Sequence, residues 1–363
     1  MKKVAIVYDR VNKWGGAERV LLALHEIFRQ APLYTSVYNP EGAPWAKVFP
    51  EVKTSFLQKF PFARSNHELL APFMSLAFES FDFTDFDLVV SVTSEAAKGI
   101  RTKPSTLHVC YCLTPTRYLW SHYEDYIRGQ LIKAVTKPFV NYLRNWDKVS
   151  AARPDKIIAI STEVKSRIKK YYGRDSNIIF PPVNTVEISL NKKNKQKHYL
   201  VVSRLVGYKK VDLVIEAFNK LGYPLIIIGT GRQEKRLKRK AKDNIKFAGQ
   251  VSEKDLSIYY SRAKALIMPQ EEDFGIVAVE AQSFGVPVIA YKKGGAVDTV
   301  IDSKTGILFD QQNVQSLTAA VARFEKTKFV VDNLYTNAKR FSKEIFKTEV
   351  LDLISEYSRI KNI

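Results

Sequence analysis

The sequence is poor in cysteine and has no long hydrophobic run. Two of its 363 residues are cysteines, Cys110 and Cys112, and they lie close together in an apolar segment. In an extended strand they would share a face near the outer limit of disulfide reach, so we expect buried thiols. No run of about 18 uncharged apolar residues occurs, and Met1 leads almost directly into the apolar segment Val4–Tyr8. These absences predict neither a membrane-spanning helix nor a signal peptide, and therefore a cytoplasmic protein.

Motifs of other functional classes are also missing. The sequence has no Gly-x-Gly-x-x-Gly fingerprint, which disfavours a dehydrogenase, and no zinc-ligand spacing or nucleic-acid recognition module. Asp85 and Asp87 match the Asp-x-Asp metal motif, but they directly precede the apolar Leu88 and no third ligand follows nearby. That context is more typical of the polar start of a strand. We therefore expect no metal ion and no other cofactor.

The formal net charge is +20, which implies an acidic partner. The basic residues are spread over Lys133–Arg144, Lys192–Lys197 and Arg232–Lys246 rather than gathered in one recognition element. An anionic membrane surface fits this distribution better than nucleic acid does. For any single cluster, solvated surface lysine is an equally good interpretation.

Strand-like apolar segments alternate with helical patterns along the chain, which predicts parallel sheets covered by helices. In the first half Val4–Tyr8 leads through Gly15-Gly16 into an amphipathic segment at 17–28. Further strands are predicted at 88–92, 107–112, 156–160, 199–203, 224–228, 245–247, 265–268 and 286–290. The sequence therefore predicts an α/β protein with two doubly wound, Rossmann-like domains.

A hinge is predicted between the two halves. Consecutive prolines at Pro181-Pro182 precede a polar, lysine-rich segment at 191–198. We place the first domain at 1–184, a linker at 185–197 and the second domain at 198–343. The segment 344–363 carries a broad apolar stripe, and the pattern alone is equally compatible with packing on either domain.

Two glutamates mark the predicted ligand crevice of the second domain. Glu272 falls in the loop after the buried strand 265–268, and Glu280 falls within the helix predicted at 275–284. In an open parallel sheet, ligands bind outside the carboxyl ends of the strands. Amides at the helix start attract an anion or sugar oxygens, whereas two carboxylates repel a bare phosphate, so a phosphorylated sugar satisfies both.

At this point the chain resembles the retaining family 4 of glycosyltransferases, whose signature is glutamate, seven residues, glutamate. The resemblance follows Glu271–Ala290, Gly294–Ala296 and Thr305–Phe309 in order and distance. It is strongest for the branch of mannosyltransferases that builds O-antigen and other bacterial surface polysaccharides, and it covers nearly the whole chain. The resemblance implies the GT-B architecture, in which two Rossmann-like domains face each other across a cleft and the final helix crosses back to the first.

The resemblance also implies roles for residues of the second domain. Glu280 would bind the ribose hydroxyls, and Glu272 would face the donor sugar near the reacting carbon. Arg204 and Lys209 would clamp the diphosphate, where negative charge grows during transfer. We assign Glu272, Arg204 and Lys209 as catalytic. Main-chain atoms would contribute further donor contacts, at Asp273, Phe274, Gly275 and Ile276 for the sugar and at Val251 for the base.

In the first domain Gly15 and Gly16 join a strand to its helix, so that backbone amides can approach the donor closely. The turn resembles the family's amino-terminal glycine loop. A later segment resembles the family's acceptor region and places Arg117 and Tyr118 on the acceptor side. The family usually has a histidine where this chain has Leu113. In front-face retaining transfer the leaving phosphate can take the acceptor proton, so no side-chain base is required.

These observations predict a retaining hexosyltransferase that moves mannose from GDP-mannose to a lipid-linked oligosaccharide in bacterial surface polysaccharide assembly. It would act as a peripheral protein at the inner face of the cell membrane. Two alternatives stay open. The same fold can use a UDP-hexose, because donor choice rests on a few residues. The departure at Leu113 also allows a catalytically silent relative that only binds a nucleotide-sugar or glycan.

Overall fold

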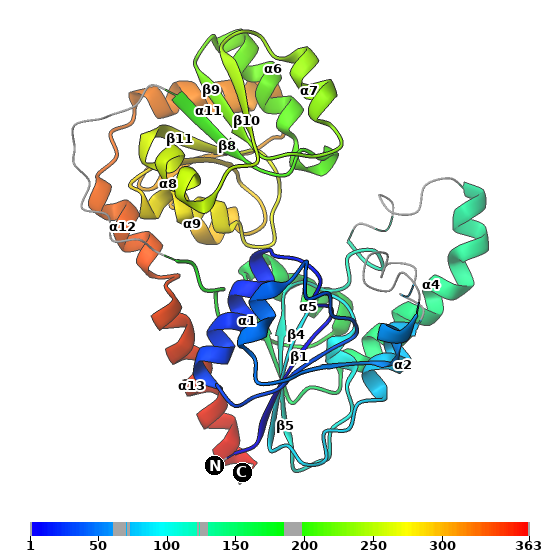
Figure 1. Cartoon of the computed structure of the whole chain (residues 1–363). Coiled ribbons are helices and arrows are strands. Elements are labelled where there is room, and N and C mark those ends of the chain that lie inside the picture. The colour runs from blue at the N-terminus through cyan, green and yellow to red at the C-terminus, as the bar shows by residue number, and fades with distance from the viewer. Residues whose placement is uncertain are drawn as a thin grey trace. The chain divides into compact units, whose positions relative to one another are not determined.

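The computed structural model describes residues 2–60, 70, 73–121, 123, 130–184 and 198–361, with backbone alone for 130–134. The contacts divide the chain into two compact units, Met1–Pro182 with Lys343–Ile363, and Val183–Ser342 (Figure 1). The predicted linker 185–197 lies outside the described residues. The second unit begins at Val183 because its N–H donates to the carbonyl of Phe341 at 2.9 Å, which ties the two ends of this unit together.

The first unit is built on a seven-stranded sheet in the order β3-β2-β1-β4-β5-β6-β7. All its neighbouring strands are parallel. Because helices cover both faces of such a sheet, its central strands β4 and β5 are buried along their whole length. The strands are β1 Val4–Tyr8, β2 Leu33–Thr35, β3 Val52–Thr54, β4 Leu88–Thr93, β5 Leu107–Cys112, β6 Lys156–Ala159 and β7 Asn177–Ile178.

The helices of the first unit come from both ends of the chain. They are α1 Gly16–Ile27, α2 Met74–Glu79, α4 Gln130–Ala151, α5 Thr162–Tyr172 and α13 Lys343–Ile360, with 3-10 helices η1 Pro44–Val48, η2 Phe56–Lys59 and η4 Ala97–Gly99. Local signals set their limits. For example, the Ser161 hydroxyl caps α5 by accepting the N–H of Val164 at 3.1 Å, and Gly173 ends it with a left-handed φ of 69°.

The last helix, α13, packs against the first unit (Figure 1). The buried Phe346 ring meets the ring of Tyr111 of β5 with centroids 5.7 Å apart. Lys343 Nζ lies 2.8 Å from a carboxylate oxygen of Glu26 of α1. These contacts place α13 on the first unit, although it follows the second unit in the sequence. The apolar stripe alone was compatible with packing on either domain. None of the helices in the described part of the chain is long and apolar enough to cross a membrane.

The second unit is built on a six-stranded parallel sheet in the order β10-β9-β8-β11-β12-β13. Its strands are β8 His198–Val202, β9 Leu225–Ile228, β10 Ile245–Gly249, β11 Ala263–Met268, β12 Val288–Tyr291 and β13 Gly306–Phe309. Its helices are η5 Gly207–Lys209, α6 Val211–Leu221, α7 Glu234–Lys240, α8 Glu253–Arg262, α9 Ile276–Ser283, α10 Ala296–Thr299, α11 Val314–Lys326 and α12 Val331–Lys339. Strands and helices alternate along the chain, as the apolar pattern predicted.

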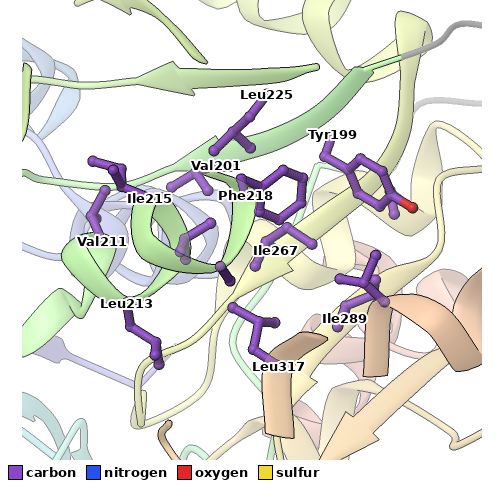
Figure 2. Packing of buried hydrophobic residues seen from close by; sticks show 14 of the residues in the cluster. Tyr199, Val201, Val211, Leu213, Ile215, Phe218, Leu225, Ile267, Ile289 and Leu317 are labelled. Carbon is purple, nitrogen blue, oxygen red and sulfur yellow. The ribbon is translucent and has the colours of Figure 1, made fainter. Parts of the chain in front are cut away.

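The core of this unit has two layers, one on each face of the sheet. Figure 2 shows the layer in which Phe218 of α6 and Leu317 of α11 meet Val201 of β8 and Ile267 of β11. On the other face, α8 and α9 pack around the buried Tyr260. Helices thus cover both faces of the sheet, and functional side chains are left to the loops at the carboxyl ends of the strands.

Candidate functional site

The predicted donor residues gather where the strand order of the second sheet reverses. From β8 the chain proceeds outward through β9 and β10, whereas β11 on the other side of β8 continues through β12 and β13. Arg204 and Lys209 follow β8, and Glu272 follows β11. Because neighbouring parallel strands end at the same edge, these loops meet at the switch point, where open α/β sheets bind ligands.

Tyr208 links the two predicted phosphate-binding cations. Arg204 Nη2 donates to the Tyr208 hydroxyl at 2.5 Å, and the ammonium of Lys209 lies 5.2 Å from the centre of the same ring. Lys209 also forms an ion pair with Glu272, and the two side chains are only 12% and 18% exposed. The fold therefore brings Arg204, Lys209 and Glu272 into one cluster, with Tyr208 as a member that the sequence analysis missed.

The backbone around Glu272 is held by a glycine pair. The N–H of Gly295 donates to the carbonyl of Glu272 at 2.8 Å, and Gly294 forms a β-bridge with Glu272. A Cβ on Gly294 would lie 2.2 Å from the Glu272 carbonyl, and its φ is +64°. Glycine is required here for both reasons. The buried Gln270 also fixes the carboxylate, because its Nε2 donates to Glu272 Oε1 at 2.8 Å.

Helix α9 starts beside this carboxylate. Gly275 precedes it with a left-handed φ of 89°, and no side chain caps the helix. Ile276 is its first residue, and the preceding Phe274 is buried with its ring 5.4 Å from that of Phe341. The first amides of any α-helix have no partner within the helix, so they can donate hydrogen bonds to ligand oxygens. The predicted sugar contacts at 273–276 fall at this helix start.

Glu280 is the fifth residue of α9, and Tyr260 of α8 contacts it. The Tyr260 hydroxyl donates to Glu280 Oε2 at 2.9 Å, and the Tyr260 ring is buried. Val251 precedes α8, and its side chain packs against the core. Ser252 then caps α8 by accepting the N–H of Asp255 at 3.1 Å. The side chain of Val251 is thus engaged in the core, and the predicted base contact at its main chain stays a prediction.

The predicted first-domain residues all belong to the first unit. Gly15 and Gly16 open α1, and the carboxylate of Glu18 lies at this helix start, where it accepts the Tyr8 hydroxyl at 3.1 Å. Burial raises the pKa of Glu18, while hydrogen bonds from the backbone of Glu18 and Gly15 lower it.

Arg117 and Tyr118 follow β5 in a half-buried segment. Burial, and then the nearby Glu95 carboxylate, raise the pKa of the Tyr118 hydroxyl, which keeps it neutral as a hydrogen-bonding group. Leu113, which stands where the family has histidine, donates its N–H to the carbonyl of Thr93 at 2.8 Å. It thereby connects the ends of β4 and β5.

Asp9 is a second residue that the sequence analysis missed. It is buried at the end of β1, and its carboxylate accepts the N–H groups of Glu95 at 3.0 Å, Ala96 at 2.9 Å and Ala97 at 2.8 Å. Arg10 completes this arrangement with an ion pair to Glu95 at 2.5 Å. β1 and β4 are the strands at which the order of the first sheet reverses. Asp9 therefore shapes the loop at the switch point of the first unit.

The candidate metal motif has a structural role in this fold. Asp87 Oδ2 accepts the backbone N–H of Lys3 at 2.8 Å and so connects the starts of β1 and β4. Asp85 lies in the turn just before it. The strand-start interpretation of this motif accounts for both residues.

Comparison with known proteins finds a family model that matches the second unit. Residues 184–344 match the family described as Glycosyl transferases group 1. The chain is also 30% identical over 217 residues to the O-antigen chain mannosyltransferase RfbU of Salmonella typhimurium, an alignment that covers 53% of this chain and 61% of that relative. The chain thus spans about three fifths of the length of this curated relative.

Solved structures share the fold over nearly the whole chain. The crystal structure of Anabaena Alr3699/HepE in complex with UDP has a TM-score of 0.72 at 17% identity and covers 98% of this chain and 100% of its own. The apo lipopolysaccharide outer core galactosyltransferase WaaB has a TM-score of 0.69 at 18% identity, with 98% and 99% covered. At this identity the likeness concerns the fold alone. It confirms the predicted α/β fold with two parallel sheets of the GT-B kind.

Proposed function

We propose that this chain, which carries a glycosyl transferases group 1 domain at residues 184–344, is a retaining hexosyltransferase that uses a nucleotide-sugar donor. The observation that carries the proposal is the ion pair of Lys209 with Glu272 at the switch point of the second sheet. Around this pair lie a second cation, Arg204, and the uncapped start of α9. Cations for a diphosphate and a carboxylate for a sugar thus lie side by side.

The chemistry follows from the charges. When the bond between the anomeric carbon and the phosphate oxygen breaks, negative charge grows on the diphosphate, and Arg204 and Lys209 stabilise it. Glu272 faces the sugar, and Glu280 accepts the ribose hydroxyls. The acceptor hydroxyl attacks the anomeric carbon on the face that the phosphate leaves, and its proton passes to that phosphate oxygen. The anomeric configuration is retained, and Leu113 is compatible with this route because it needs no protein base.

The proposed donor is GDP-mannose. The mannose assignment is supported by similarity to the RfbU mannosyltransferase and by the resemblance of the Glu271–Ala290 segment to mannosyltransferases of surface polysaccharides. The rival donor is a UDP-hexose, which the UDP complex of the structurally similar HepE favours. A silent relative that binds donor without turnover is the remaining alternative, and it is motivated by Leu113.

The proposed acceptor is a lipid-linked oligosaccharide at the inner face of the cell membrane, and no metal ion takes part. The net charge of +20 supports an anionic membrane as partner. Arg117 and Tyr118 would contact the acceptor, and Gly15 and Gly16 would approach the donor.

A donor panel tests the proposal. We would measure binding and slow hydrolysis of GDP-mannose, UDP-glucose, UDP-galactose and UDP-N-acetylglucosamine with the wild-type protein, Lys209→Ala and Glu280→Ala, in the presence of EDTA. We expect GDP-mannose alone to bind and to be hydrolysed. NMR spectra should show that the released sugar first has the same anomeric configuration as in the donor. Selective use of a UDP-hexose would identify that sugar nucleotide as the donor in place of GDP-mannose. Binding without any hydrolysis would favour the silent relative. No binding of any donor would contradict the proposed donor site.

A further inference from the structure

Gln270 carries a buried carbonyl that has no hydrogen-bond partner among the described residues. Its side chain is 2% exposed, and its Nε2 donates to Glu272 Oε1 at 2.8 Å, but no described residue donates to its own Oε1. The orientation of the amide is fixed, because a carboxylate only accepts hydrogen bonds and the NH2 group must therefore face it. The unpaired atom is thus an acceptor, and a ligand that satisfies it must bring a donor.

An unpaired carbonyl in the interior of a protein destabilises the fold. Burial removes its hydrogen bonds to water, and most buried polar groups in folded proteins have a partner. Other contacts already hold this loop. Gln312 Nε2 donates to the carbonyl of Pro269 at 2.9 Å, and the N–H of Gly295 donates to the carbonyl of Glu272 at 2.8 Å. The Gln270 carbonyl therefore does not serve the fold, and its place beside Glu272 points to a ligand.

The neighbouring carboxylate offers a second acceptor. Lys209 and Gln270 both donate to Glu272 Oε1, whereas none of the described residues donates to Oε2. The Glu272 side chain is 18% exposed, so the carboxylate is partly open to solvent. Two acceptors thus lie together in the loop after β11. Directly after them come the first amides of α9, which are donors.

This combination of acceptors and donors selects a sugar hydroxyl. A hydroxyl donates one hydrogen bond and accepts others, so it can pair with the Gln270 carbonyl and with helix amides. An ionised phosphate or carboxylate only accepts, and it would leave the carbonyl unpaired and meet the like charge of Glu272.

We propose that Gln270 recognises one hydroxyl of the sugar that the donor carries. Its Oε1 accepts the hydroxyl proton, and its Nε2 keeps the Glu272 carboxylate in place. The last torsion of a glutamine side chain is broad, so the amide can turn toward the hydroxyl. The inference rests on the proposed function for the nucleotide-sugar donor, and it deepens that function by naming a residue that determines specificity for the sugar.

Changes in the protein and in the ligand, measured together, test this proposal. Calorimetric titration would give the affinities of the wild type and of Gln270→Met for GDP-mannose and its monodeoxy analogues. If the donor panel selects a UDP-hexose, the deoxy series of that hexose is used instead. In the wild type we expect one deoxy analogue to bind about tenfold or more weakly than its parent, because the carbonyl stays unpaired. In Gln270→Met this analogue and its parent should bind within about twofold of each other.

Gln312→Met is the matched control. It makes the same substitution and removes a hydrogen bond to the same loop, at the carbonyl of Pro269. We expect it to keep the wild-type preference among the analogues. Melting curves should show that Gln270→Met is folded, because methionine fills a similar volume and removes the unpaired carbonyl together with the hydrogen bond to Glu272. The titrations measure binding and need no turnover, so they also apply to a silent relative.

Two results would overturn the proposal and leave the donor site intact. If Gln270→Met weakened the binding of the parent and of every analogue equally, Gln270 would only position Glu272. If the wild type bound every analogue as tightly as the parent, no sugar hydroxyl would reach the carbonyl, and a water molecule would be its partner. Failure of the proposed function looks different: the wild type would then bind no nucleotide-sugar, and both proposals would fall.

Discussion

Lys209 and Glu272 lie 63 positions apart in the sequence and form an ion pair at the carboxyl ends of the neighbouring strands β8 and β11. Both side chains are mostly buried, so neither charge is fully solvated. In this pair the two charges balance each other. Under the proposed function, a donor diphosphate would compete with Glu272 for the ammonium of Lys209.

Substitution of Lys209 by alanine should mainly reduce turnover. It removes one cation from the place where phosphate charge develops, and comparable preorganised contacts contribute about 10² to 10³-fold to kcat. Steady-state kinetics with the donor identified by the panel would measure this loss. Unchanged turnover in a well-folded variant would contradict the role that we assign to Lys209.

The neighbouring Lys210 provides the matched control. Its φ of 53° is left-handed, which glycine adopts without the cost that a side chain carries. Lys210→Gly removes the same charge one position away, and we expect it to preserve turnover and to raise the free energy of unfolding by up to about 1 kcal/mol. Denaturant unfolding beside the kinetics separates the two effects.

Substitution of Glu280 by alanine should weaken nucleotide binding roughly tenfold, because the ribose would lose a hydrogen-bond acceptor in a largely buried place. It also leaves the buried Tyr260 hydroxyl without this acceptor. Tyr260→Phe is the control, since it removes the same hydrogen bond and keeps the carboxylate. Calorimetric titration should show weak binding for the first variant and near-normal binding for the second. Equal affinities would argue against ribose recognition by Glu280.

Gly295 should tolerate no side chain, because an added Cβ would lie 2.1 Å from the carbonyl of Phe274 at the start of α9. We expect Gly295→Ala to destabilise the protein by about 1–3 kcal/mol and to weaken donor binding. At Gly222, with φ +72°, nothing lies within 4 Å, so Gly222→Ala should cost about 1–2 kcal/mol through backbone strain alone. Its donor affinity should stay normal. Melting curves and titrations of both variants would check this difference.

The buried His108 should make stability depend on pH. Burial lowers its pKa from 6.5 to about 3. Between pH 6.5 and pH 3 the histidine is therefore protonated in the unfolded chain and neutral in the folded chain. Its contribution is fully present above pH 6.5 and is lost toward pH 3, with a slope of up to about 1.4 kcal/mol per pH unit. Between pH 7 and 5, His108→Gln should show a flatter stability curve than the wild type. If the free energy of unfolding of the two proteins depended on pH with the same slope, that result would contradict a buried neutral imidazole at His108.

Longer strands were predicted from the sequence, whereas the shortest ones were missed. The strand at 107–112 was predicted with its observed limits, because its six mostly apolar residues have the length of a buried strand and not of a helix. β2 and β3 were not predicted, since each has three residues and carries no period of its own. Gln270 and Tyr260 were missed as partners of the two glutamates, because a hydrogen bond between distant side chains leaves no local pattern.

The sequence by itself determined the α/β class, the alternation of strands and helices, and the types of residue at the donor site. These are local properties, expressed in apolar period, glycine position and motif spacing. Only the tertiary structure decided that β8 lies beside β11, that Lys209 therefore meets Glu272, and that α13 contacts β5 and α1. Such pairings depend on which apolar faces bury each other, and that choice belongs to the whole packed chain.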